Sequence, residues 1–192
     1  EALFMRALLH LYLVQSYGPV PYVNTTSYEV NQSIGKSDIT SVYGLCKADL
    51  QASVNLLPAT FSAGNRIYPT KMAAYTVLAR IAYYEKNWEE AVQYSSMVIG
   101  NTLYKIETDL NKVFLKDGTV SIIQLLPFNS TSSTSQGNVF ILNTAPPTNV
   151  ALRQDFVNEF ESGDGRKAAW IGQKSDSQGK IYYYPYKYKQ YS

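Results

Sequence analysis

The chain has 192 residues, of which 45% are hydrophobic and 17% charged, so it is long enough and apolar enough to bury a core without disulfides. Its net charge of +2 gives no argument for a nucleic-acid partner, and one cysteine with one histidine excludes a disulfide framework and the usual zinc sites. We therefore expect a globular protein that carries no cofactor and whose unusual feature is its 17 tyrosines.

The first half of the chain is predicted to be helical. Apolar residues cover most of the circumference of a helix over residues 2–17, which predicts burial on more than one side and an end at Gly18. A loop with scattered aromatics follows. A second helix is expected from Ser37 or Asp38, both good N-caps, to Pro58.

Two further helices are predicted on either side of a link of one or two residues. The first starts near Thr70, and the second begins after Asn87. The Asn87 side chain can cap this helix while the Glu90 carboxylate reaches back to the Asn87 amide, and Gly100 is the expected C′ residue. So short a link predicts an antiparallel helical hairpin.

The sequence pattern changes after about residue 110, where a smaller, loop-rich part with short strands is expected. Strands are predicted over residues 120–126, 139–142 and 181–191. Pro185 restricts the last of these to a sheet edge or a bulge. Residues 129–138 are expected to form a polar surface loop, residues 149–161 a short amphipathic helix and residues 175–179 a turn.

No pattern in the sequence indicates catalysis. There is no glycine-rich phosphate loop and no G-x-S-x-G nucleophile elbow. His10 lies among leucines and is predicted to be a packed histidine with one satisfied nitrogen, and Cys46 is predicted to be a small buried hydrophobe. No two carboxylates can be placed across a substrate, so we expect no enzymatic activity.

Five blocks of sequence resemble, in order, those of SusD/RagB-type nutrient-uptake proteins. The opening EALFMRALLHLYLVQSYGPVPYV is similar to the family's signature helix and turn, whose places are filled by Glu1, Ala2, Phe4, Arg6, Ala7, Tyr17, Gly18, Val20 and Pro21. The later blocks are Val42-Tyr43 to Leu57-Pro58, Leu78-Ala79-Arg80 with NWEEA, FESGDGR and PYKY.

The resemblance implies a mainly α-helical fold. Tetratricopeptide-like helix pairs, a SusD-like α-α superhelix, are expected over residues 1–110, with a loop-rich, partly β subdomain over residues 111–192. The lipid-anchor cysteine, the first helices and the C-terminal helices of the family pattern are expected to lie outside this sequence. Members of the family sit on the outer face of the bacterial outer membrane, bind glycans or other nutrients and deliver them to a TonB-dependent, SusC-like transporter without enzymatic activity.

Glycan-binding residues are sought among aromatic side chains in polar surroundings. The flat face of a tyrosine or tryptophan covers the C–H face of a sugar, and nearby amides bond its hydroxyls. The candidates are Tyr22, Tyr28, Asn31, Trp170, Tyr182 and Tyr184. The tyrosines on helices with apolar neighbours are instead expected in the core or between helices, namely Tyr12, Tyr75, Tyr83, Tyr84 and Tyr94.

Two other functions remain open on the sequence. A helical-repeat scaffold could bind a protein or peptide in a groove, which predicts polar side chains on a concave helical face. Glycosidase activity ranks below both binding functions, because nothing in the sequence positions a pair of catalytic acids.

Overall fold

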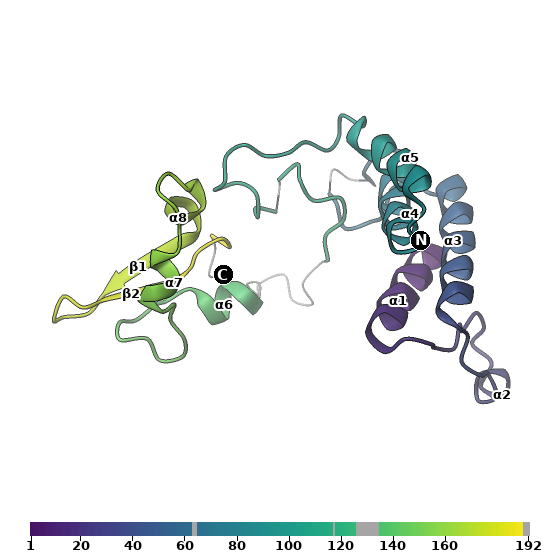
Figure 1. Ribbon diagram of the computed structural model, residues 1–192, viewed down its shortest axis with the longest axis horizontal. Helices are drawn as coiled ribbons and strands as arrows, with labels where there is room; N and C mark the ends of the chain where they lie inside the picture. The colour runs from purple at the N-terminus through teal and green to yellow at the C-terminus, as the bar shows by residue number, and fades with distance from the viewer. Residues whose placement is uncertain (63–64, 117, 126–134, 190–192) are drawn as a thin grey trace. The chain divides into compact units, whose positions relative to one another are not determined.

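The computed structural model describes residues 1–62, 65–116, 118–125 and 135–189 (Figure 1). Contacts along the chain divide it into two compact units. Unit 1 comprises residues 1–105 and 121–124, and unit 2 comprises residues 106–120 and 125–192. The chain thus returns briefly to unit 1 before it completes unit 2. The predicted domain boundary between residues 110 and 111 stays a proposal, because this division does not test whether either part folds alone.

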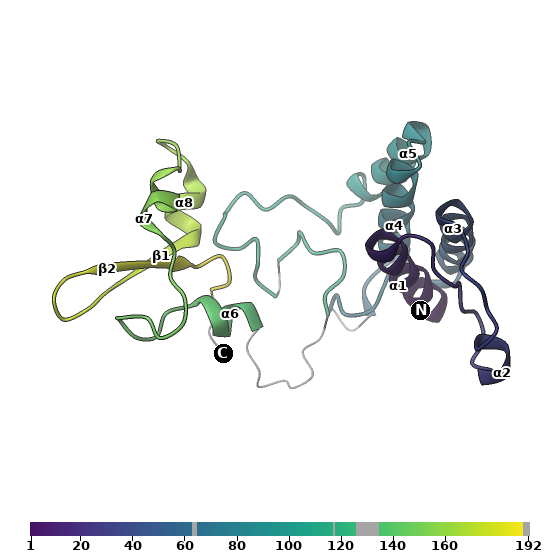
Figure 2. The same cartoon turned by 60° about the horizontal axis from the view of Figure 1, so that its bottom comes forward.

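Unit 1 is helical, as predicted. Its helices are α1 (Ala2–Tyr17), the short α2 (Tyr28–Asn31), α3 (Ile39–Leu56), α4 (Lys71–Tyr84) and α5 (Trp88–Ile99). Helix α3 packs against α1 and α4, and α4 packs against α5 (Figures 1 and 2). The α4–α5 pair is the predicted hairpin, with a link of three residues rather than one or two.

The start of α5 forms only half of the predicted capping box. The Asn87 side-chain oxygen accepts a hydrogen bond from the Glu90 backbone at 3.2 Å, as expected. However, the Asn87 amide donates to the Ala82 carbonyl, and the Glu90 carboxylate binds Lys47 on α3 at 2.9 Å. At the other end of α5, Gly100 has a right-handed φ of −71° and so does not adopt the left-handed conformation expected of a C′ glycine.

The core of unit 1 lies between α1, α3 and α4. Its largest fully buried apolar side chains are Phe4, Leu11, Val42, Leu50, Leu78 and Ile81. The prediction that α1 is buried on more than one side is wrong for the described structure. Leu9 and Leu13 are 54% and 42% exposed because α3 and α4 cover only the opposite side of the helix.

The tyrosines of the helices divide into two groups. Tyr75 and Tyr94 are half-buried and stack between α4 and α5 with ring centres 5.9 Å apart, as expected for residues between helices. Tyr12, Tyr83 and Tyr84 are 50%, 61% and 49% exposed, so the expectation of a core position is wrong for them. Tyr83 and Tyr84 are the last two residues of α4, next to the link to α5.

The helices and strands of unit 2 that the structure describes are short. They are α6 (Ser135–Phe140), α7 (Gln154–Asn158), α8 (Gly165–Trp170), β1 (Ile171–Ser175) and β2 (Ile181–Pro185). The strands form an antiparallel hairpin in which Gln173 lies opposite Tyr183 and Gly172 opposite Tyr184. The predicted turn over residues 175–179 joins them, and β2 ends at Pro185, which supplies no amide hydrogen for a continued ladder.

Two predicted strands do not form in the described residues. Residues 120–125 are irregular, and two of their backbone groups bond to Arg66. The Arg66 guanidinium donates to the Ser121 carbonyl at 2.7 Å, and the Gln124 amide donates to the Arg66 carbonyl at 2.8 Å. β-Branched residues favour a strand only where a neighbouring strand can complete its hydrogen bonds.

Helices replace other predicted elements of unit 2. Residues 139–140 end α6 instead of starting a strand, and α6 also takes up residues 135–138 of the predicted polar loop, whose remainder lies outside the described residues. The helix predicted over residues 149–161 is reduced to α7. Helix α8 was not predicted, although Asp164 caps it by accepting the Arg166 amide at 2.8 Å.

Candidate functional site

The predicted ligand-binding residue Tyr22 is buried rather than exposed. Its side chain is 8% accessible, its hydroxyl donates to the Asp49 carboxylate at 2.6 Å, and its ring lies 4.2 Å from that of His10. Arg6 donates to both oxygens of Asp49 at 2.6 Å. The prediction of a surface aromatic at Tyr22 is therefore wrong, because a buried carboxylate on α3 draws this ring inward.

This buried network holds the turn after α1. Both His10 nitrogens are satisfied rather than one, because Nδ1 bonds the Arg6 carbonyl at 2.8 Å and Nε2 accepts the Val23 amide at 3.1 Å. Burial opposes the ionisation of Asp49, but the hydrogen bonds from Arg6 and Tyr22 outweigh it and lower the pKa of Asp49. The hydrogen bonds of this network all lie within unit 1, so we interpret the network as structural.

Cys46 lies beside this network and is buried, as predicted. The side chain is 0% accessible, and its thiol points to the Ala7 carbonyl at 3.5 Å. Burial, followed by the nearby Asp49 charge, raises the pKa of Cys46 to about 12. A thiol held in this way is a poor nucleophile.

Tyr28 and Asn31 lie on the short helix α2. The Tyr28 side chain is 78% exposed. The Asn31 amide nitrogen donates to the Thr25 carbonyl at 2.8 Å, and its Oδ1 is buried without a partner among the described residues. A ligand role for the pair stays a prediction, and Asn31 is oriented toward its own loop.

Trp170 packs inside unit 2. Its indole N–H donates to the Leu110 carbonyl at 2.8 Å, and its ring meets Phe114 edge-on at 5.5 Å. Both contacts fix the orientation of the side chain, which is half-buried. They are the contacts of a structural tryptophan, and a ligand role for Trp170 stays a prediction.

Tyr182 and Tyr184 share one face of the hairpin with Gly172 and Lys174, because successive side chains of a strand alternate between its faces. The Tyr184 ring lies directly over Gly172, since a Cβ placed there would be 2.4 Å from the ring carbon Cζ. The Tyr182 hydroxyl donates to Asp176 at 3.1 Å. These half-buried rings brace the hairpin, and their predicted contact with a ligand is untested.

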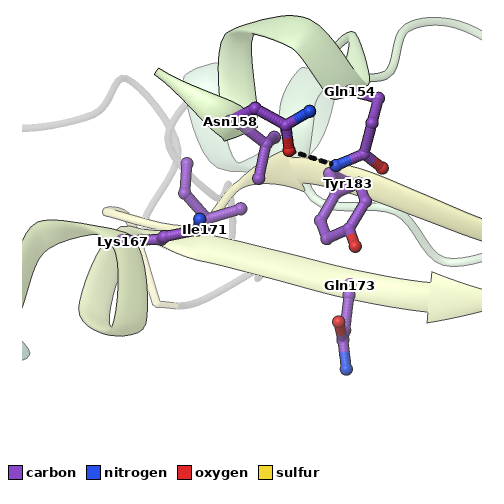
Figure 3. A pocket seen from close by; sticks show the side chains of 7 residues that line it. Gln154, Asn158, Lys167, Ile171, Gln173 and Tyr183 are labelled. Atoms are coloured by element: carbon purple, nitrogen blue, oxygen red, sulfur yellow. Dashed lines mark hydrogen bonds between the residues drawn. The ribbon is translucent and has the colours of Figure 1, made fainter. Parts of the chain in front are cut away.

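The opposite face of the hairpin contains a pocket of about 340 Å³, which we call the amide pocket. Its walls are Gln154, Val157 and Asn158 of α7, Lys167 of α8, Ile171 and Gln173 of β1, and Tyr183 of β2 (Figure 3). This volume is in the range of small-molecule sites in proteins. All seven lining residues belong to unit 2.

The walls of the amide pocket are tied together. Val157 is 2% exposed and anchors α7, while the Leu152 amide donates to the Tyr183 carbonyl at 2.7 Å and joins the segment before α7 to β2. The Gln154 side-chain nitrogen donates to the Asn158 oxygen at 2.9 Å (Figure 3). That bond leaves the Gln154 oxygen as an acceptor and the Asn158 nitrogen as a donor for a bound molecule.

The chemistry of this lining is that of a binding site. Three primary amides, a lysine and a tyrosine provide hydrogen bonds and an aromatic face, and no carboxylate is among the lining residues. Nowhere in the described ranges do three or more His, Cys, Asp or Glu side chains gather so as to hold a metal ion. An amide-rich lining can bind a polyhydroxylated molecule but offers no pair of acids for glycoside cleavage.

Sequence reasoning missed every residue of the amide pocket. It selected Tyr182 and Tyr184 from a run of tyrosines and passed over Tyr183, although alternation along a strand places Tyr183 on the other face. In the register of the hairpin, Gln173 lies opposite Tyr183 and so shares this face. No local signal marks Gln154 or Asn158, because the contact of α7 with the hairpin is formed between distant residues.

Comparisons with known proteins agree with this fold. Residues 1–84 match the SusD-like family model described as "starch-binding associating with outer membrane". The SusD-like protein P2 of Formosa agariphila is 25% identical over 173 residues, which are 85% of this chain and 33% of that protein. The chain thus spans about a third of this curated relative.

Solved structures extend the likeness to both units. A SusD superfamily protein from Bacteroides vulgatus has a TM-score of 0.71 at 24% identity, over 96% of this chain and 45% of its own. The surface glycan-binding protein A from Bacteroides uniformis also has a TM-score of 0.71, at 18% identity, over 99% of this chain and 47% of its own. The mainly helical, tetratricopeptide-like fold predicted from the sequence is confirmed.

Within the described parts of the chain, none of the helices has the length and apolar character needed to span a bilayer. The family model, the curated relative and the solved structures that this chain matches are all SusD-like. The N-terminal 84 residues are thus similar to the SusD-like family model, and the chain shares the fold of solved SusD-like proteins.

Proposed function

We propose that this chain is part of a cell-surface protein that binds a glycan and delivers it to a TonB-dependent, SusC-like transporter. The protein acts on the outer face of the outer membrane, where a lipidated N-terminal cysteine anchors it. The family description, starch binding in association with the outer membrane, supports both the ligand class and the location. The glycan-binding name of the Bacteroides uniformis protein supports the ligand class.

The amide pocket is the observation that carries this proposal. A sugar ring presents hydroxyl groups at its rim, and the amides of Gln154, Asn158 and Gln173 can donate to them or accept from them. The Tyr183 ring offers an apolar face for the C–H groups of the sugar. The protein binds its ligand without altering it, because no acid lies on the pocket wall to protonate a glycosidic oxygen.

Calorimetric titration with a panel of oligosaccharides tests the proposal. We expect Tyr183→Ala and Gln173→Ala to weaken binding of the best ligand about 10-fold each, because each removes a contact worth about 1–2 kcal/mol. Tyr182→Ala is the matched control, since it lies on the opposite face of the same strand. A larger loss from Tyr182→Ala would place the ligand on the face predicted from the sequence.

Circular dichroism of each variant shows whether a weakened ligand affinity reflects unfolding rather than a lost contact. An assay for new reducing ends, run on the same ligand, would reveal hydrolysis and contradict a pure binding role. Failure of the wild-type protein to bind any member of the panel would remove the glycan assignment.

An exposed aromatic cluster favours protein binding as a second function. Tyr83, Tyr84 and Trp88 at the α4–α5 link are 61%, 49% and 56% exposed. Their rings meet edge-to-face, with centres 5.9 Å apart for the two tyrosines and 5.6 Å apart for Tyr83 and Trp88. Exposed aromatic clusters of this kind are typical of protein contacts.

Copurification with the co-expressed SusC-like transporter tests this second function. Trp88→Ala should reduce the amount of transporter recovered, because tryptophans often dominate the binding energy of interfaces. Tyr17→Ala is the control, since Tyr17 is another exposed aromatic, on α1 and 77% accessible. Equal recovery with Trp88→Ala and wild type would rule out the cluster as the transporter contact.

A further inference from the structure

The amide pocket has a single charged residue in its wall. Lys167, on the last turn of α8, lines the pocket together with amides, aliphatic side chains and Tyr183. We propose that the amide pocket selects a sugar that carries an anionic substituent, a carboxylate or a sulfate ester, which the Lys167 ammonium binds. This inference rests on the proposed function and narrows its ligand class.

Two arginines that precede pocket-lining residues in the sequence are paired with acids. Arg153 forms an ion pair with Asp155 at the start of α7, and Arg166 pairs with Asp164 at 2.6 Å at the start of α8. Asp155 and Asp164 are therefore already bound to arginines. Within the part of the chain that the structure describes, Lys167 has no ion-pair partner, so its positive charge is uncompensated at the pocket wall.

The remaining wall suits an anionic ligand. No lining residue carries a negative charge that would repel a carboxylate or a sulfate. The Asn158 amide nitrogen, whose oxygen is used by Gln154, remains a hydrogen-bond donor in the same lining. Figure 3 shows these side chains around the same pocket, with Tyr183 and Gln173 on the hairpin side. The Lys167 ammonium thus shares the pocket with neutral side chains that can form hydrogen bonds to the sugar hydroxyls.

A lysine in the last turn of a helix also complements the partial negative charge of that helix end. That role would make Lys167→Gln slightly destabilising and would leave ligand preference unchanged. Selection of an anionic ligand instead predicts a change in preference between charged and neutral sugars. The two roles therefore differ in a binding measurement that compares matched ligands.

The experiment is a calorimetric titration of the full chain with matched oligosaccharides in three arms. One arm contains uronate oligosaccharides, one contains sulfated galactan oligosaccharides, and one contains their neutral counterparts of equal length and linkage. We expect one anionic arm to bind at least about 10-fold more tightly than its neutral counterpart, and the arm that does so identifies the substituent. Added salt should weaken that arm only.

Three variants locate the effect. Lys167→Gln should lower affinity for the anionic ligand about 10-fold and affinity for the neutral ligand by less, whereas Lys167→Arg should retain most of the preference. Lys180→Gln, at the turn end of the same hairpin and outside the pocket lining, is the matched control and should change neither.

The outcomes separate this inference from the proposed function. Equal or tighter binding of neutral sugars by the wild type would overturn the inference and leave the glycan-binding function intact. An equal loss of both ligand classes in Lys167→Gln would also overturn it. No binding in any arm would overturn the inference and the proposed function together.

Discussion

The buried polar network of unit 1 and the amide pocket of unit 2 differ in how far their polar groups are satisfied. In unit 1, Arg6, Asp49 and Tyr22 bond one another inside the protein, and both nitrogens of His10 have backbone partners. In unit 2, Gln173 and Lys167 line an open pocket with hydrogen-bonding capacity left over. Satisfied polar groups fix a structure, whereas unsatisfied groups at a pocket are available to a ligand.

The two units also differ in how their elements are held. Helices α1, α3 and α4 share one apolar core. Phe4, Leu11 and Leu50 belong to this core and are buried from solvent. Among the residues that the structure describes, the sheet of unit 2 has two strands, and a two-stranded sheet depends on what packs on its faces. We therefore expect unit 1 to determine stability and unit 2 to determine ligand preference.

The two tryptophans allow the units to be followed separately, because Trp88 lies in unit 1 and Trp170 in unit 2. Replacing either one with phenylalanine leaves a single fluorescent reporter. The only cysteine, Cys46, is buried in unit 1, so its reaction with iodoacetamide reports the opening of that unit. These probes make the comparison of the units measurable.

The largest effect is expected from Asp49→Ala. The substitution leaves the part-buried Arg6 guanidinium and the buried Tyr22 hydroxyl without their partner, so it should lower the free energy of unfolding by about 3 kcal/mol. Urea denaturation followed by Cys46 labelling measures the loss. A change below about 0.5 kcal/mol would show that the network does not stabilise unit 1.

Gly172→Ala tests the hairpin in the same way. The added methyl group would lie 2.4 Å from Cζ of Tyr184, so the ring has to move and the hairpin should lose about 2 kcal/mol. Fluorescence of Trp170 in a Trp88→Phe background measures it. Gly35→Ala, where no atom lies within 4 Å of the new Cβ, is the control, and an equal effect at both glycines would contradict the ring-over-glycine packing.

Acidification should affect unit 1 through Asp49. The pKa of Asp49 is lowered in the folded protein, so its contribution to stability is complete above the unfolded value of 3.8 and is lost as the pH falls through the folded value. Unfolding measured between pH 7 and pH ~2.5 should therefore show a steeper acid loss for wild type than for Asp49→Asn. Parallel curves would assign the acid loss to other carboxylates.

The smallest effect is expected from Lys47→Gln. Lys47 on α3 bonds Glu85 at 3.0 Å and Glu90 at 2.9 Å and so links α3 to the α4–α5 hairpin. These side chains are partly exposed, which limits the loss in free energy of unfolding to about 0.5–1 kcal/mol. The loss should shrink in high salt, and a salt-independent loss would indicate packing of the lysine stem instead.

Prediction from the sequence worked best where the hydrogen bonds are local. Helices α1, α3, α4 and α5 lie where their periodicity and caps place them, because a helix closes its bonds within four residues. Prediction failed for residues 120–125. The Ser121 carbonyl in this segment accepts a hydrogen bond from Arg66, which is 55 positions away in the sequence. A sequence pattern does not reveal which distant residue will take such a bond.

The same limit explains the candidate site. The tyrosine run predicted a strand with aromatic residues on alternate faces, and the strand forms as Ile181–Pro185. Which face would meet α7 was not predictable, because Leu152 and Val157 fix that contact through one backbone bond and one buried side chain. Tyr182 and Tyr184 were thus selected in place of Tyr183.

The sequence by itself determined the helical half of this protein, its resemblance to SusD-like proteins and the absence of a disulfide framework. These properties follow from residue types and short-range spacing, which fold local structure directly. Only the tertiary structure decided that Tyr22 is buried against Asp49 and that Tyr183, Gln173 and Lys167 share a pocket. Burial and cavity lining depend on contacts between distant segments, and those contacts exist only once the chain has packed.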